Sequence, residues 1–311
     1  MSFPLRLKAD LALGLVSFIW GATFVVVQAA LVDASPLVFV LLRFALAAAL
    51  LFVIFRRHGG IREPGMARAG AVLGFFLAAG YAFQTIGLKY TTPAKSAFIT
   101  ALSVAMVPLI LVLVFRRRLR AAAVAGVAAA AVGLYYLTVP AGEFSIARGD
   151  LITLFCALAF AGHIVAIGHY APRHSVAGLA VWQVAAGFVW TAVALPLMAA
   201  AGLEPPHLAW SARLAGALVV TAVLATALAF SIQTWAQRFT SATHTAILFS
   251  LEPVFAALTS YVFLGEVLSG RGWLGAGLIL AGVLLAELPG GAPPVVPGAP
   301  SSANAAGRDP V

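Results

Sequence analysis

Five short segments of the chain each place an aromatic side chain three residues before a group that forms hydrogen bonds. The pairs are Trp20/Thr23, Tyr81/Gln84, Phe160/His163, Phe230/Gln233 and Phe249/Glu252. Residues three apart lie on one face of an α-helix, so each helix would present aromatic surface beside a polar group. Small-molecule sites combine apolar walls with a few placed polar groups. The first four pairs therefore predict a substrate cavity between helices; for any single pair, the alternative is ordinary aromatic packing.

Arg43 and Glu252 are ionisable residues inside long apolar runs. Charges in such surroundings are costly and normally face the bundle interior or a wet cavity. Arg43 suits the carboxylate of a substrate; the alternative is a structural ion pair, for which Asp33 is the suggested partner. Glu252 suits proton coupling; the alternative is a neutral carboxyl bonded to the carbonyl that Pro253 leaves unpaired one turn back.

Two histidines, His163 and His244, also lie near the interiors of apolar runs. They suit a proton relay, and the alternative is hydrogen bonding between helices. They do not form an H-x-x-x-H pair, so no metal site is expected. Trp182 and Gln183 are expected to extend the lining of the cavity. No phosphate-binding G-x-x-x-x-G-K-[ST] loop occurs in the sequence, and no cofactor is expected.

The composition indicates that the elements carrying these residues lie in a lipid bilayer. The chain of 311 residues is 62% hydrophobic and only 9% charged, and its mean hydropathy is +1.03. A soluble domain carries roughly 25% charged residues. The formal charge of +9 does not indicate nucleic-acid binding, because the Arg and Lys residues lie between apolar runs rather than on one face.

Ten apolar segments have the length that a membrane-spanning helix needs, about 20 residues for a hydrocarbon core of about 30 Å. The predicted spans are 9–30, 36–55, 67–88, 94–114, 121–138, 150–170, 177–199, 212–236, 243–264 and 271–288. Helices are expected throughout, because lipid cannot satisfy an open backbone. The Pro- and Gly-rich tail 289–311 is expected to be disordered.

The basic residues predict the orientation of the spans. Most Arg and Lys residues fall on the side of the N-terminus, including Arg56, Arg57 and the run 116–118. Cytoplasmic loops carry such an excess, so both termini are predicted to be cytoplasmic, in a bacterial inner membrane.

The two halves of the chain, 1–140 and 141–288, align with each other. A shift of 140 residues places Asp10 on Asp150 and Ser35 on Ser175, and a shift of 149 places Gln84-Thr85 on Gln233-Thr234 and Gly133 on Gly282. Five spans are an odd number, so the second half must enter the membrane from the opposite side. The predicted fold is therefore an all-α integral membrane protein of ten transmembrane helices, arranged as two inverted-topology five-helix repeats, an arrangement that supports alternating access.

Several short motifs occur in a familiar order: Trp20-Gly-Ala-Thr23, Pro36 with Arg43, Thr240-Ser-Ala-Thr-His-Thr-Ala246, Leu251-Glu-Pro-Val254, Phe263-Leu-Gly-Glu266, and Gly275 with Gly282. Through them, residues 9–288 resemble a ten-span member of the EamA family in the drug/metabolite transporter superfamily. The resemblance implies a bacterial inner-membrane carrier, commonly an exporter of amino acids or other small metabolites, without an ATPase.

A secondary transporter, possessing no enzyme activity, is therefore the leading hypothesis. The alternatives are a membrane-embedded enzyme, although no H-E-x-x-H or G-x-S-x-G motif is present, and a non-transporting scaffold. Arg43 together with the aromatic residues favours amino acids as substrates, with proton coupling as an option. The expected partners are the small-molecule substrate and the lipid bilayer, and a monomer is favoured.

Overall fold

The computed structural model describes residues 4–91, 93–116, 121–139, 148–264 and 269–287. Over these residues the chain is helical, and its extended structure is limited to one isolated bridge between Ala34 and Leu208. The all-helical prediction is confirmed. The predicted boundary at residue 140, Glu266 and the tail 289–311 lie outside the described ranges.

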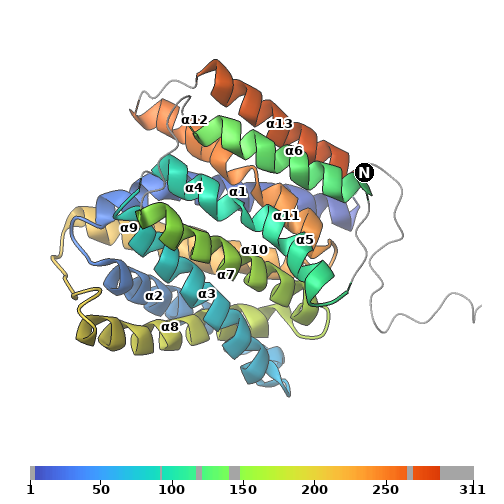
Figure 1. Ribbon diagram of the computed structural model, residues 1–311. Helices are drawn as coiled ribbons and strands as arrows, with labels where there is room; N and C mark the ends of the chain where they lie inside the picture. Colours follow the sequence, from blue (N-terminus) through green and yellow to red (C-terminus); the bar gives the residue numbers. More distant parts are fainter. Residues whose placement is uncertain (1–3, 92, 117–120, 140–147, 265–268, 288–311) are drawn as a thin grey trace, which may run out of the picture.

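The helices form one bundle, with most axes running between the same two ends (Figure 1). The first half contains α1 (Leu5–Ala30), α2 (Pro36–Phe55), η1 (Gly59–Arg62), α3 (Met66–Leu88), α4 (Pro93–Ala101), α5 (Ser103–Leu113) and α6 (Ala121–Thr138). The second half contains α7 (Arg148–Tyr170), α8 (Val176–Ala200), α9 (Ala212–Ala222), η2 (Val223–Leu228), α10 (Ala229–Ala236), α11 (Ala242–Phe249), α12 (Glu252–Leu264) and α13 (Gly270–Glu287).

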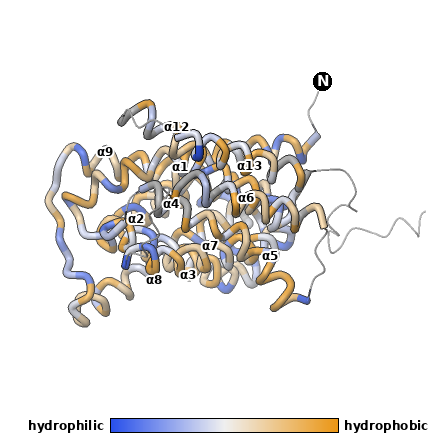
Figure 2. Tube along the Cα trace, turned by 45° about the horizontal axis from the view of Figure 1, so that its top comes forward, coloured by the Kyte–Doolittle hydropathy of each residue, from blue (hydrophilic) through white to orange (hydrophobic). Residues whose placement is uncertain are grey.

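Seven helical segments of the described chain are long and apolar enough to cross a membrane. They are α1, α2, α3, α7, α8, Ala212–Ala236 and Ala242–Thr259, and shorter apolar helices cover Ile99–Leu113 and Val124–Gly133. Hydrophobic residues follow the helices in Figure 2, and hydrophilic residues gather mainly at helix ends and connections. The chain is thus a multi-pass membrane protein.

Two of the predicted spans are interrupted near their middle. The span predicted at 94–114 breaks at Leu102, between α4 and α5, and the span predicted at 243–264 breaks at Ser250 and Leu251. At the second break, the Ser250 hydroxyl donates to the Ile247 carbonyl at 2.6 Å. Pro253 then lies in the first turn of α12, where its missing N–H costs least. Glu252, predicted in mid-span, is therefore the first residue of a helix.

The span predicted at 212–236 contains a different irregularity. Its helices α9 and α10 are joined by η2, a π-helical turn of six residues. In this turn the backbone N–H of Ala229 donates to the carbonyl of Leu224, five residues back. The shift in hydrogen-bond register releases a neighbouring carbonyl, that of Ala225, from its usual partner four residues ahead.

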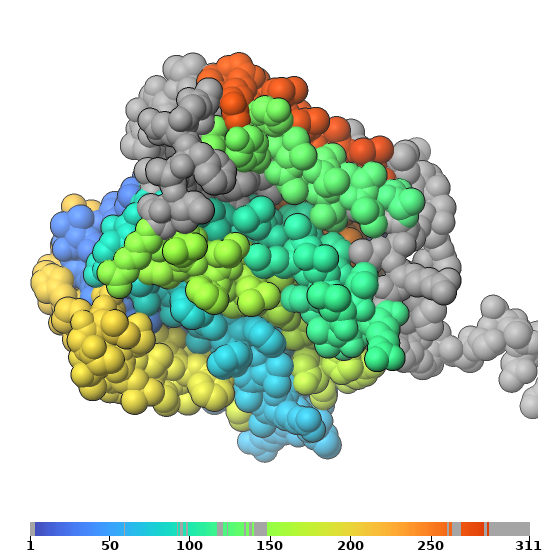
Figure 3. Space-filling model, in the orientation of Figure 1, coloured from blue at the N-terminus to red at the C-terminus, as the bar shows by residue number. Residues whose placement is uncertain are grey.

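Helices α6 and α13 lie side by side along one edge of the molecule (Figure 3), and glycines set their distance. A Cβ atom added to Gly133 would lie 2.6 Å from the Gly275 carbonyl oxygen, and one added to Gly282 would lie 2.6 Å from the Gly126 carbonyl oxygen. Gly126 and Gly133 correspond to Gly275 and Gly282 under the 149-residue shift, so each of these glycines of α6 meets the counterpart of the other, in antiparallel order. Glycine at these positions allows the two helices to approach each other closely.

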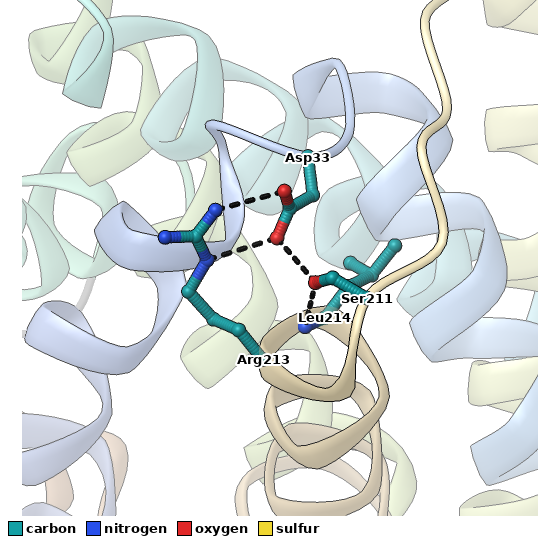
Figure 4. A network of polar contacts seen from close by, with 4 residues as sticks. All are labelled: Asp33, Ser211, Arg213 and Leu214. Carbon is teal, nitrogen blue, oxygen red and sulfur yellow. Dashed lines mark hydrogen bonds and ion pairs between the residues drawn. The ribbon is translucent and has the colours of Figure 1, made fainter.

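An ion pair ties the turn between α1 and α2 to the start of α9 (Figure 4). Arg213 donates to both carboxylate oxygens of Asp33, from Nη2 at 2.8 Å and from Nε at 2.9 Å. The Ser211 hydroxyl donates to the same carboxylate at 2.6 Å and also caps α9. These hydrogen bonds, from Arg213 first and Ser211 second, lower the pKa of Asp33 to about 2.

Candidate functional site

A cavity of about 50 Å³ lies where α1, α2, α3, α7 and the interrupted helices converge. It is called the central cavity below. Its lining includes most of the residues that the sequence pattern predicted: Trp20, Thr23, Arg43, Tyr81, Gln84, Phe160, His163, Phe230, Gln233, Phe249 and Glu252. The aromatic and polar pairs from both halves of the chain therefore meet around one space.

Both helix breaks open onto the central cavity. Thr100, Ala101 and Ser103 line it on either side of the break at Leu102, and Phe249 and Glu252 line it on either side of the second break.

Aromatic rings form a continuous wall of the cavity. The ring of Trp20 lies 5.3 Å from that of Phe230 and 4.9 Å from that of Phe249, measured between centroids. Tyr81 packs edge-on against Phe160 at 5.3 Å and against Phe230 at 6.1 Å. Such edge-to-face packing is favourable and rigid, and it provides an apolar surface for a bound side chain.

Arg43 is almost fully buried, with 3% of its surface exposed. Its Nε donates to the Thr226 hydroxyl at 2.6 Å, and its Nη2 donates to the Tyr81 hydroxyl at 2.8 Å and to the Ala225 carbonyl at 3.0 Å. Its guanidinium carbon lies 4.0 Å from the centroid of the Tyr81 ring. The suggested pairing with Asp33 is wrong, because Asp33 binds Arg213 at the end of the bundle. Among the described residues, no carboxylate forms an ion pair with Arg43.

Glu252 is likewise buried, with 6% of its surface exposed, and it faces the same cavity. The alternative considered for Glu252, a bond from a neutral carboxyl to the carbonyl left by Pro253, is not formed among the described residues. Over the described parts of the chain, the carboxyl of Glu252 makes no hydrogen bond. The central cavity therefore holds a cationic group and a carboxyl group that are not paired with each other.

His163 is held through a chain of hydrogen bonds that begins at the cavity wall. Its Nε2 lies 3.0 Å from Oε1 of Gln183, whose Nε2 donates to the Thr234 hydroxyl at 3.0 Å. The Thr234 hydroxyl in turn donates to the Phe230 carbonyl at 2.6 Å. Because the amide oxygen of Gln183 can only accept, Nε2 of His163 carries a proton in this contact.

Three residues singled out from the sequence lie away from the cavity lining. Gln183 acts through His163 rather than at the wall. Trp182, its neighbour, points elsewhere on the helix, and its indole N–H donates to the Ile61 carbonyl at 2.9 Å. His244 lies 3.0 Å from a carboxylate oxygen of Asp10, where α11 meets the first part of α1. The structure thus separates His244 from the other two proton-coupling candidates, His163 and Glu252.

The sequence pattern missed Thr226 and the Ala225 carbonyl, which hold Arg43 in place. A signal was available, because Thr226 lies four residues before Phe230 and seven before Gln233, on the same helix face as that predicted pair. The acceptor role of Ala225 had no such signal, because it depends on the π-helical register.

Known proteins are similar to nearly the whole chain. The profile of the EamA-like transporter family matches residues 7–139 and again residues 147–288. An "uncharacterized transporter" of Archaeoglobus fulgidus is 38% identical over 283 residues, which cover 91% of this chain and 87% of that protein. A "probable amino-acid metabolite efflux pump" of Salmonella typhimurium is 29% identical over 286 residues, 87% of this chain and 92% of that protein.

A solved crystal structure shares the fold, with a TM-score of 0.71 and 22% identity over 90% of this chain and 96% of that chain. The family profile, matched in both halves, and the A. fulgidus relative agree with a multi-pass membrane bundle. The chain therefore belongs to the EamA-like transporter family.

Proposed function

We propose that the protein is a secondary active transporter that exports amino acids with apolar side chains, or closely related metabolites, by alternating access. The observation that carries this proposal is the central cavity, where Arg43 and Glu252 face one space and are not ion-paired. A zwitterionic ligand would neutralise both groups, with its carboxylate at Arg43 and its ammonium group at Glu252. The wall of Trp20, Tyr81 and Phe230 would hold the apolar side chain.

Alternating access rests on the arrangement of ten spans as two inverted repeats. Each interrupted pair, α4 with α5 and α11 with α12, is counted as one span, as are α9, η2 and α10 together. The two breaks support the repeat, because the 149-residue shift places Leu102 on Leu251. The glycine contacts of α6 and α13 support it too, because two surfaces related by a two-fold axis make reciprocal contacts. Such inverted halves exchange conformations during transport.

The proposed orientation places both termini in the cytoplasm of a bacterial cell, as the distribution of basic residues suggests. Residues of α1 that line the cavity, Trp20 to Val27, lie in the second half of that helix. An apolar cluster that includes Leu13, Val16 and Val107 packs the bundle nearer the N-terminus. The cavity would then face outward, with its cytoplasmic side closed. The name of the S. typhimurium relative, an efflux pump, favours export.

A screen of ligand-induced stabilisation tests the proposed substrate class. Purified protein is heated with L-amino acids, their carboxamides, nucleosides, vitamins and amphipathic cations, and the shift in unfolding temperature is measured. We expect apolar L-amino acids to raise the unfolding temperature, because a ligand that binds only the folded state stabilises it by mass action. Stabilisation by nucleosides or cations, with none by any amino acid, would overturn the proposed substrate class.

A further inference from the structure

Of the three hydrogen bonds that Arg43 donates to described residues, two go to the π-helical turn η2. Two consecutive residues of the turn receive hydrogen bonds from the guanidinium, Ala225 through its carbonyl and Thr226 through its hydroxyl. The Ala225 carbonyl also accepts from the indole N–H of Trp20 at 2.9 Å. It can do so because the N–H of Ala229 turns to Leu224 instead. The irregular turn is therefore what supplies an acceptor to this part of the cavity wall.

A second hydrogen bond of Thr226 determines which group donates in its contact with Arg43. The Thr226 hydroxyl donates to the Thr221 carbonyl at 2.8 Å, five residues back along the turn. Its hydrogen is thereby committed, so its oxygen must accept from Nε of Arg43. Thr226 is fully buried, and the contact is a charge-assisted hydrogen bond in a dry environment.

These contacts engage one edge of the guanidinium and leave another part of it open. Nε donates to Thr226, and the two hydrogens of Nη2 are directed to Tyr81 and Ala225. Within the part of the chain that the structure describes, Nη1 has no hydrogen-bond partner, and Arg43 lines the cavity. An arginine has five N–H donors in a rigid fork, so fixing Nε and Nη2 also fixes where the two N–H groups of Nη1 point.

Neither η2 nor Arg43 has a counterpart of the same kind in the other half of the internal repeat. Under the 149-residue shift, η2 corresponds to residues 74–79, which lie within the uninterrupted helix α3. Under the 140-residue shift, Arg43 corresponds to Gln183. Arg43 of the first half meets η2 of the second half, whereas the corresponding positions, Gln183 and residues 74–79, have neither an arginine nor a π-helical turn; this is the relation expected if the turn exists to hold the guanidinium.

We propose that η2 holds the Arg43 guanidinium in place and that Thr226 is a positioning residue. By fixing Nε, Thr226 orients the two N–H groups of Nη1 toward a substrate carboxylate. This inference rests on the proposed function, because it assumes that Arg43 binds the carboxylate. It goes further in assigning specificity for the acid over its amide to a residue that does not itself touch the substrate.

Affinities for an acid and its carboxamide test the assignment. The ligands are L-leucine and L-phenylalanine, each paired with its amide, and binding to the purified full-length protein is measured by calorimetry. We expect the wild type to bind each acid more tightly than its amide, and Arg43→Lys to lose this preference. Thr226→Val should weaken binding of the acids about tenfold, the loss typical of a hydrogen bond to a charge, while amide binding stays within about twofold.

Three further variants separate positioning from folding. Thr226→Ser keeps the hydroxyl and should restore the preference for the acid. Thr191→Val removes another buried hydroxyl, which donates to the Gly187 carbonyl of its own helix, and should leave the preference unchanged. Thr226→Cys, whose thiol is a weak acceptor, replaces the valine variant if that protein does not fold.

The outcomes distinguish the two proposals. If Thr226→Val keeps the wild-type preference while Arg43→Lys loses it, the positioning role is wrong and the proposed function stands. If the wild type does not prefer the acids, or if Arg43→Lys retains the preference, the proposed carboxylate site fails and the role of Thr226 fails with it.

Discussion

Nε2 of His163 lies 3.0 Å from Oε1 of Gln183, and these two residues occupy the positions that Thr23 and Arg43 occupy in the first half. At these two positions the second half satisfies its polar groups within the protein, whereas the first half presents Arg43 with donors still open to the cavity. The two halves share an arrangement of helices but differ in the polar groups that they present to a ligand at these positions.

Gln183→Leu should destabilise the protein and weaken amino-acid binding, because it leaves the N–H of His163 without its acceptor and removes the donor to the Thr234 hydroxyl. A buried group without a partner costs about 1–3 kcal/mol. The double variant Gln183→Leu/His163→Leu should recover part of the unfolding free energy but not the binding, since both partners are then apolar. Unfolding in mixed micelles and ligand calorimetry measure the two effects. Strictly additive losses in the double variant would show that the two residues are not coupled.

Glu252→Gln should abolish the coupling of transport to a proton gradient without abolishing substrate exchange. The amide keeps the shape of the side chain but cannot release a proton, so accumulation driven by a pH gradient should be lost, while substrate counterflow persists with a weaker apparent affinity because the ammonium group of the substrate loses its anionic partner. Glu63→Gln is the matched control, because Glu63 binds the backbone N–H of Ser175 outside the cavity. Proteoliposomes with an imposed pH gradient provide the measurement. Gradient-driven accumulation by Glu252→Gln at the wild-type level would rule out this residue as the coupling group.

Gly133→Ala and Gly282→Ala should each destabilise the protein by about 1–3 kcal/mol, the usual cost of overpacking. In both cases the new Cβ meets a carbonyl oxygen of the facing helix at 2.6 Å. Gly277→Ala, also in α13, meets nothing within 4 Å and should not destabilise. Unfolding free energies in mixed micelles measure these effects. Unequal losses at Gly133 and Gly282 would argue against a symmetric contact between α6 and α13.

Asp33→Asn should lower the unfolding temperature near neutral pH and have little effect in strong acid. Hydrogen bonds from Arg213 and Ser211 lower the pKa of Asp33 from 3.8 to about 2 in the folded protein. The folded pKa lies below the unfolded one, so this stabilisation is present above about 3.8 and is lost as pH falls through about 2. Thermal unfolding of both proteins across this range measures it. A difference that persisted unchanged in acid would contradict the proposed cause.

The sequence predicted the helices and most of the cavity lining because hydropathy and helical spacing carry that information. Helix α3 and the pair Tyr81/Gln84 lie where the pattern placed them. The breaks at Leu102 and Leu251 were missed because both residues are apolar and continue the run. The pairing of Asp33 was missed because its partner is 180 residues away. The role of Ala225 was missed because a carbonyl acceptor depends on hydrogen-bond register, not on side-chain type.

Uptake of radiolabelled L-leucine into proteoliposomes, by the wild type and by Arg43→Gln, tests the central claim most directly. Arg43→Gln removes the charge but keeps a polar side chain that can still reach η2, and the thermal unfolding of both proteins shows whether each is folded. We predict saturable uptake by the wild type that unlabelled L-phenylalanine inhibits and L-leucinamide inhibits far less, and loss of most of this uptake in folded Arg43→Gln. Equal uptake by the two proteins, or no uptake by the wild type, would contradict the account.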